Sequence, residues 1–134
     1  MSWDITVQRF GKEYAHIAEI PEDEQCSVLG SSAEVRAAIS RFFPAVDWTD
    51  SAWGVFESDY GSVEFNMGSD EQNSGFMMHV RASSQVIPLI VAMCLSERWQ
   101  ALDCSEGVFL EKAMAPAVGL ESWTVYRDQV ISDV

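Results

Sequence analysis

Basic residues, closely spaced cysteines and long apolar runs are all scarce in this sequence, and each scarcity excludes a class of protein. The 134 residues include 8 Lys and Arg against 21 Asp and Glu, which gives a formal net charge of −13. Nucleic-acid binding through phosphates requires clustered Lys and Arg, and anionic membrane surfaces repel an acidic chain. We therefore expect neither as a partner; the charge serves solubility or attracts a basic protein or a cation.

The cysteines are too widely spaced to form a familiar metal or redox motif: they are Cys26, Cys94 and Cys104. Without a C-x-x-C pair, neither a zinc knuckle nor a thioredoxin-type site is expected, and an odd count is typical of a reducing compartment. The longest apolar run, residues 86–95, contains Pro88 and is too short to span a bilayer. Residues 1–4 show no signal-peptide pattern. We expect a cytoplasmic protein without metal or cofactor.

Length and composition favour one globular domain. The chain is short for two domains, and it is 48% hydrophobic with five Trp and seven Phe, which argues against disorder. We predict one domain over residues 1–112, with residues 113–134 forming a C-terminal extension that packs on it.

Local patterns predict the elements of that domain. Ser31 and Glu34 form a capping box that starts a helix, which Pro44 ends. Ser83 or Ser84 caps a second helix with Pro88 in its first turn, apolar almost all round over residues 87–95. A last short helix covers residues 120–131. Strands are predicted at residues 5–10, 53–58, 62–67, 76–81, 101–104 and 108–110.

Three of these strands form a meander with consistent registers. A turn at Tyr60-Gly61 pairs Phe56 with Phe65, and the next loop pairs Phe65 with Met78. One face of the sheet is then apolar. We predict an α+β two-layer sandwich, ordered β-α-β-β-β-α-β-β, with a mostly antiparallel sheet, helices on one face and a tail helix.

The polar face of the meander is a candidate ligand face, formed by Glu64, Asn66, His79 and Arg81. Glu64 lies opposite His79 in this register, with Glu57 beside it. A carboxylate facing a histidine can perform acid–base chemistry, and the alternative is a solvated cross-strand charge pair.

Cys104 is a weaker candidate for chemistry, in the run Asp103-Cys104-Ser105. A catalytic cysteine needs a nearby histidine or helix N-terminus, and nothing in the sequence places His16 or His79 beside it. A buried structural cysteine in a turn made by Asp103 and Ser105 is the favoured interpretation. We therefore name no catalytic residue.

An acidic and aromatic segment is the candidate partner-binding surface. Residues 42–80 contain no Lys or Arg but seven acids. Charge speeds encounter with a basic protein, and aromatic side chains supply anchoring area. The predicted partner-binding residues are Asp47, Trp48, Asp50, Glu57, Asp59, Tyr60, Asp70 and Glu71. A solvated acidic face is the alternative, and calcium is disfavoured because Asp70-Glu71 lacks EF-hand spacing. We expect Trp48 and Trp53 to be partly core.

The combination of Trp53-Gly54 with residues 64–68 (EFNMG), 76–81 (FMMHVR) and 101–105 (ALDCS) resembles a family of small uncharacterised bacterial proteins. The resemblance covers residues 2–110. It implies no activity and no functional residue, because that family has no established activity. The chain is also similar in general character to immunity proteins of polymorphic toxin systems.

These observations favour a protein-binding module, with an immunity-like inhibitor of a basic partner as its sharper form. One alternative is a small ligand-binding protein or enzyme that uses the face of Glu64, His79 and Arg81. Another is a homo-oligomeric structural protein.

Overall fold

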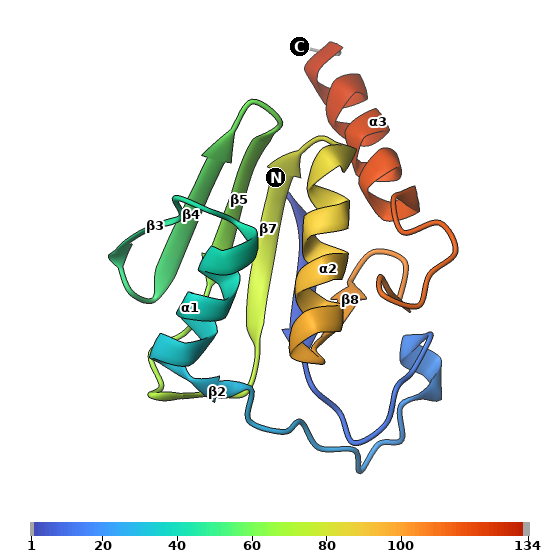
Figure 1. Ribbon diagram of the computed structural model, residues 1–134. Coiled ribbons are helices and arrows are strands. Elements are labelled where there is room, and N and C mark those ends of the chain that lie inside the picture. Colours follow the sequence, from blue (N-terminus) through green and yellow to red (C-terminus); the bar gives the residue numbers. More distant parts are fainter. Residues whose placement is uncertain (1, 133–134) are drawn as a thin grey trace.

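A seven-stranded antiparallel sheet with two helices on one face forms the centre of the computed structural model, which describes residues 2–132 (Figure 1). The strands lie in the order β3-β4-β5-β7-β1-β8-β9. The predicted α+β class is confirmed. The strands of this sheet are β1 (Trp3–Gln8), β3 (Asp47–Asp50), β4 (Trp53–Ser58), β5 (Gly61–Asn66), β7 (Phe76–Ala82), β8 (Gln100–Asp103) and β9 (Val108–Phe109). The remaining elements are the short pair β2 (Gly30–Ser31) and β6 (Gln72–Asn73), the helices α1 (Ser32–Phe42), α2 (Ile87–Glu97) and α3 (Val118–Ser132), and the 3₁₀ turns η1 (Ile17–Glu19) and η2 (Ser84–Val86).

The capping box predicted at the start of α1 is present. The Ser31 hydroxyl accepts from the Glu34 amide at 3.1 Å, and the Glu34 carboxylate accepts from the Ser31 amide at 3.0 Å. The predicted side-chain cap of the second helix is wrong. Ser83 makes no side-chain cap, because η2 runs directly into α2 and satisfies the first amides by backbone bonds.

The core lies between the sheet and the two helices. Strand β1 contributes Trp3, Ile5 and Val7, each at most 2% exposed. Three phenylalanines form an aromatic cluster beneath α1, in which the Phe43 ring lies 5.2 Å from that of Phe56 and 5.1 Å from that of Phe65. Helix α2 buries only one side.

The predicted register between β5 and β7 is confirmed, and the register between β4 and β5 is wrong by two residues. Phe65 pairs with Met78, as expected, but Phe56 pairs with Val63 rather than with Phe65. The tight turn consists of Asp59 and Tyr60, and β5 begins at Gly61, whose φ of +122° favours glycine. A shift of two residues leaves every side chain on its predicted face.

Strand β3 was not predicted, because its sequence is polar and it lies at the edge of the sheet. The strand Asp47-Trp48-Thr49-Asp50 pairs only with β4, through an irregular register. Edge strands need no apolar alternation, and charged side chains there discourage pairing with another sheet.

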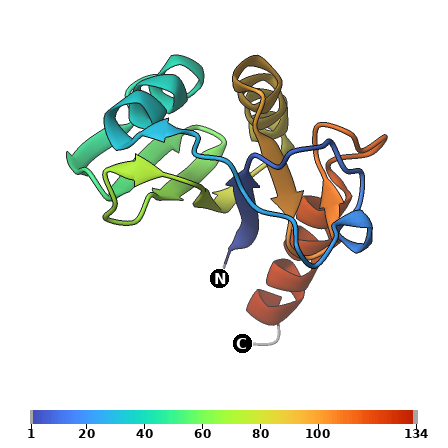
Figure 2. The same cartoon turned by 90° about the horizontal axis from the view of Figure 1, so that it is seen from below.

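Helix α3 extends the domain from the sheet side opposite α1 and α2 (Figure 2). Its first turn is anchored by Leu120, which is 1% exposed, while Val125 and Tyr126 further along are 67% and 58% exposed. The buried Asp103 carboxylate meets this turn. Its Oδ1 accepts from Trp3 Nε1 at 3.1 Å, and its Oδ2 lies against Gly119. The division at residue 112 stays a prediction.

Replacing Gly119→Ala should loosen α3. A methyl group there would clash with the Asp103 carboxylate and lie 2.8 Å from Trp3 Nε1. Such overpacking costs about 1–3 kcal/mol, to be measured by urea denaturation followed by tryptophan fluorescence. The control is Gly11→Ala, whose methyl would lie 3.6 Å from the nearest side-chain atom. Equal stability of the two variants would contradict this docking.

Candidate functional site

The open face of the sheet, opposite α1 and α2, carries a hydrogen-bonded network centred on His79. The His79 Nδ1 atom lies 2.8 Å from Asp4 Oδ1 on β1. The Trp53 indole stacks on the imidazole with ring centroids 5.5 Å apart. The indole Nε1 donates to Glu64 Oε2 at 3.1 Å, and Arg81 donates to Glu64 Oε1 at 2.7 Å. The carboxylate that holds His79 is therefore Asp4, although Glu64 lies opposite it in the register.

This arrangement brings together three of the four predicted ligand-face residues. Asn66 lies two residues further along β5, at the rim of a separate cavity of about 460 Å³. Glu57 pairs with Ser62, so it does not lie directly beside Glu64. An Asp–His pair can orient an imidazole for proton transfer, but here the Trp53 ring covers one side of the imidazole. The network joins β1, β4, β5 and β7 across the open face.

The predicted partner-binding residues fall into separate groups. Asp47, Asp50, Glu57 and Asp59 are exposed along β3, β4 and the hairpin, and Tyr60 at the hairpin tip is 46% exposed. Asp70 and Glu71 are exposed beyond the opposite end of β5. Six strand residues, about 20 Å, separate Asp70 and Glu71 from the hairpin tip at Asp59 and Tyr60, whereas Asp50 at the end of β3 lies at the same end of the sheet as Asp70 and Glu71.

The two tryptophans of this segment differ in their surroundings. Trp48 packs against the core and donates its indole N–H to Ser40 Oγ at 2.9 Å, so it is partly core as predicted. Trp53 lies on the open face instead, against His79. Trp48 therefore supports β3 from the inside, and the exposed aromatic residue of the group is Tyr60.

Cys104 is exposed, so the prediction of a buried structural cysteine is wrong, although the predicted turn is present. Asp103 Oδ1 accepts from the Ser105 amide at 2.9 Å and from its hydroxyl at 2.6 Å, which turns the Cys104 side chain outward. Both histidines are engaged elsewhere: His79 with Asp4, and His16 with the Ala18 amide at 3.0 Å. The Cys104 thiol itself lies 3.3 Å from the Thr6 hydroxyl.

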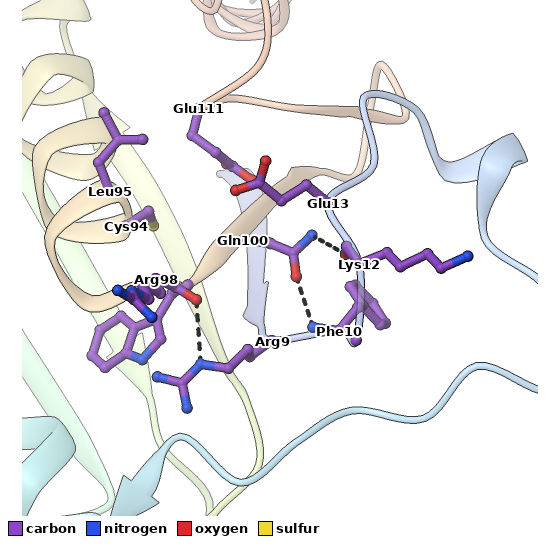
Figure 3. Close-up of a pocket in the computed structure, with 11 residues that line it drawn as sticks. Arg9, Phe10, Lys12, Glu13, Cys94, Leu95, Arg98, Gln100 and Glu111 are labelled. Carbon is purple, nitrogen blue, oxygen red and sulfur yellow. Dashed lines mark hydrogen bonds between the residues drawn. The ribbon is translucent and has the colours of Figure 1, made fainter.

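A cavity of about 670 Å³ lies where four segments meet, and sequence reasoning did not find it (Figure 3). These segments are the end of α2, the start of β8, residues 9–13 after β1, and Glu111. The lining residues are Arg9, Phe10, Gly11, Lys12, Glu13, Cys94, Leu95, Arg98, Trp99, Gln100 and Glu111. They form no local motif, because the fold assembles them from distant positions.

Two side chains hold the walls of this cavity in place. The Gln100 amide accepts from the Phe10 backbone N–H at 2.7 Å and donates to the Lys12 carbonyl at 3.0 Å. The Arg9 guanidinium donates to the carbonyls of Glu97 and Arg98 at 2.9 and 3.3 Å, which caps the end of α2. These bonds fix residues 9–13 against α2 and β8.

Two other polar groups of the cavity wall have an unused hydrogen-bonding atom. Glu111 Oε2 accepts from the Ala101 amide at 3.0 Å, but the buried Oε1 has no partner among the described residues. Burial raises the pKa of the Glu111 carboxyl above its ordinary value. The Trp99 indole N–H is also buried without an acceptor in the part of the chain that the structure describes. Such groups are uncommon in folded proteins and carry a free-energy penalty.

Comparison of the chain with protein-family models, with curated proteins and with solved structures finds no match in any of the three. The family resemblance inferred from the motifs therefore stays a prediction. Within residues 2–132, no three His, Cys, Asp or Glu residues are grouped as metal ligands. Over the same range, every helix is too short or too polar to cross a bilayer.

Glu111→Gln should stabilise the protein at neutral pH, because it removes a partly buried charge and keeps an acceptor for the Ala101 amide. The raised pKa means that ionisation is less favourable in the folded than in the unfolded chain. The wild type therefore loses stability as the pH rises through the folded-state pKa. Urea denaturation at pH 5 and pH 7.5 should show the advantage of the variant growing with pH. The control is Glu106→Gln, which removes an exposed carboxylate. A difference in the free energy of unfolding between Glu111→Gln and the wild type that does not change with pH would contradict the interpretation.

Proposed function

We propose that this protein is an acidic protein-binding module whose partner is a basic protein. The observation that carries the proposal is the one-sided charge of the β3–β4 edge, defined here as β3, β4 and the turn Asp59-Tyr60. This edge exposes Asp47, Asp50, Glu57 and Asp59, and its sequence contains no Lys or Arg. The acids therefore present a negative field that no basic side chain of the edge offsets.

Local hydrogen bonds hold two of these carboxylates in position. Asp47 Oδ1 accepts from the Thr49 hydroxyl at 2.6 Å and from its amide at 2.8 Å, which holds the pKa of Asp47 below its ordinary value. Asp50 accepts from the Ala52 amide at 2.9 Å. Carboxylates fixed in this way lose little conformational freedom when a Lys or Arg of the partner approaches.

Tyr60 supports a direct contact at the tip of the same edge. This residue is 46% exposed, and tyrosine is a favoured anchor in protein interfaces. Asp70 and Glu71 form a second acidic group at the Asp50 end of β3, about 20 Å along β5 from the hairpin tip. The proposal makes the β3–β4 edge the primary surface, because this edge adds the exposed Tyr60 to its acids.

An immunity-like inhibitor is the sharper form of this proposal. It rests on the acidic charge and on the general similarity of the sequence to such proteins. In that form the basic partner would be a toxin, and binding would block its activity.

A tagged pull-down from the native host, washed at low and then high salt, should recover one basic protein that high salt releases. Screening weakens attraction between exposed charges, so release by salt identifies an electrostatic contact. Stopped-flow association should then be several-fold slower for the double variant Glu57→Lys and Asp59→Lys, because charge steers encounter.

The matched double variant is Asp70→Lys and Glu71→Lys, which changes the net charge by the same amount. Stronger slowing by the Glu57 and Asp59 variant supports docking on the β3–β4 edge, and stronger slowing by the Asp70 and Glu71 variant would contradict it. Equal slowing would indicate an effect of net charge alone and would contradict a docking site on the β3–β4 edge.

A further inference from the structure

Opposite charges line separate sides of the 670 Å³ cavity. Three of the eight Lys and Arg residues of this acidic chain line it, namely Arg9, Lys12 and Arg98. Figure 3 shows the carboxylates of Glu111 and Glu13 close together on one side, whereas Arg9 and Arg98 approach from another. Such a charge pattern suits a molecule with a positive and a negative end.

The unused hydrogen-bonding atoms define what each end must supply. Among the described residues Glu111 Oε1 lacks a donor, and Trp99 Nε1, on a side chain that is 3% exposed, lacks an acceptor; both atoms are covered by other protein atoms, so the ligand meets them after these side chains turn toward it. The Arg98 side chain is exposed at the cavity and forms no ion pair with any described residue. A ligand that pairs these groups removes the penalty of leaving them unpaired.

We propose that this cavity binds a small apolar zwitterion, a free amino acid or a dipeptide. Its ammonium group pairs with Glu111, and its carboxylate pairs with Arg98 and the Trp99 indole N–H. Its apolar side chain packs against Phe10 and Leu95, which line the same cavity. The volume falls within the range of about 300–1,000 Å³ that is usual for small-molecule sites.

Two side chains already order the backbone that forms the cavity walls. The Gln100 amide and the Arg9 guanidinium form their hydrogen bonds with backbone groups, so they hold the walls in place and leave Glu111 and Arg98 to contact the ligand. Because this backbone is already ordered, it loses little conformational freedom when the ligand binds.

This site is distinct from the proposed protein-binding surface. The cavity is built around β8, whereas the β3–β4 edge lies at the other end of the strand order. Either proposal can fail without affecting the other.

Calorimetric titration of the full chain at pH 7 tests the proposal with L-phenylalanine and L-leucyl-L-phenylalanine as probes. Phenethylamine lacks the carboxylate, and 3-phenylpropionate lacks the ammonium group. We expect saturable binding of at least one zwitterion and roughly ten- to hundredfold weaker binding of both analogues, the usual effect of losing a charged hydrogen bond. The tighter of the two probes distinguishes an amino-acid site from a dipeptide site. No saturable binding of either zwitterion at millimolar concentration, or equal binding of an analogue, overturns the proposal.

Two variants test which residue pairs with each charged end of the ligand. Glu111→Gln keeps the acceptor for the Ala101 amide, and Arg98→Gln changes an exposed side chain, so both should fold. Each should weaken binding of the zwitterion about tenfold or more. The matched controls Glu106→Gln and Arg36→Gln should bind like the wild type. Unchanged affinity in either Glu111→Gln or Arg98→Gln overturns the assigned geometry.

Discussion

The insertion of β1 between β7 and β8 is the constraint on which the rest of the structure depends. Trp3, Ile5 and Val7 are buried against the helices, and the strand pairs with β7 on one side and with β8 on the other. Its other face brings Asp4 beside His79. Just beyond its end, the Arg9 side chain donates a hydrogen bond to a backbone carbonyl of α2.

Each end of β1 positions a neighbouring part of the structure: its start contacts α3, and the residues after its end line the cavity. At the start of the strand, Trp3 bonds to Asp103, and that carboxylate meets the first turn of α3. Beyond its end, residues 9–13 form one wall of the cavity, fixed by Gln100. The position of a six-residue strand thus couples the tail helix, the open face and the cavity.

The acidic charge of the protein is unevenly distributed, which gives two surfaces of different character. The β3–β4 edge has no basic residue, whereas the cavity near β8 collects Arg9, Lys12 and Arg98. Long-range attraction of a basic protein suits the first surface, since exposed charge acts over a Debye length. Close pairing with a small charged ligand suits the second, because its polar groups are partly removed from water.

Local sequence patterns determined the three helices, most strands and the faces of the sheet, but not the polar edge strand β3. The capping box of Ser31 and Glu34 depends on residues three apart, and the pairing of Glu64 with His79 depends on alternation across one loop. Both are short-range effects, so a single sequence contains them. Only the tertiary structure decided that Asp4 holds His79, that Cys104 is exposed and that Glu111 lines a cavity with Trp99. Those contacts join residues far apart in the chain, and they depend on the order of the strands in the sheet. That order is selected by burial of the whole core, and no local sequence pattern encodes it.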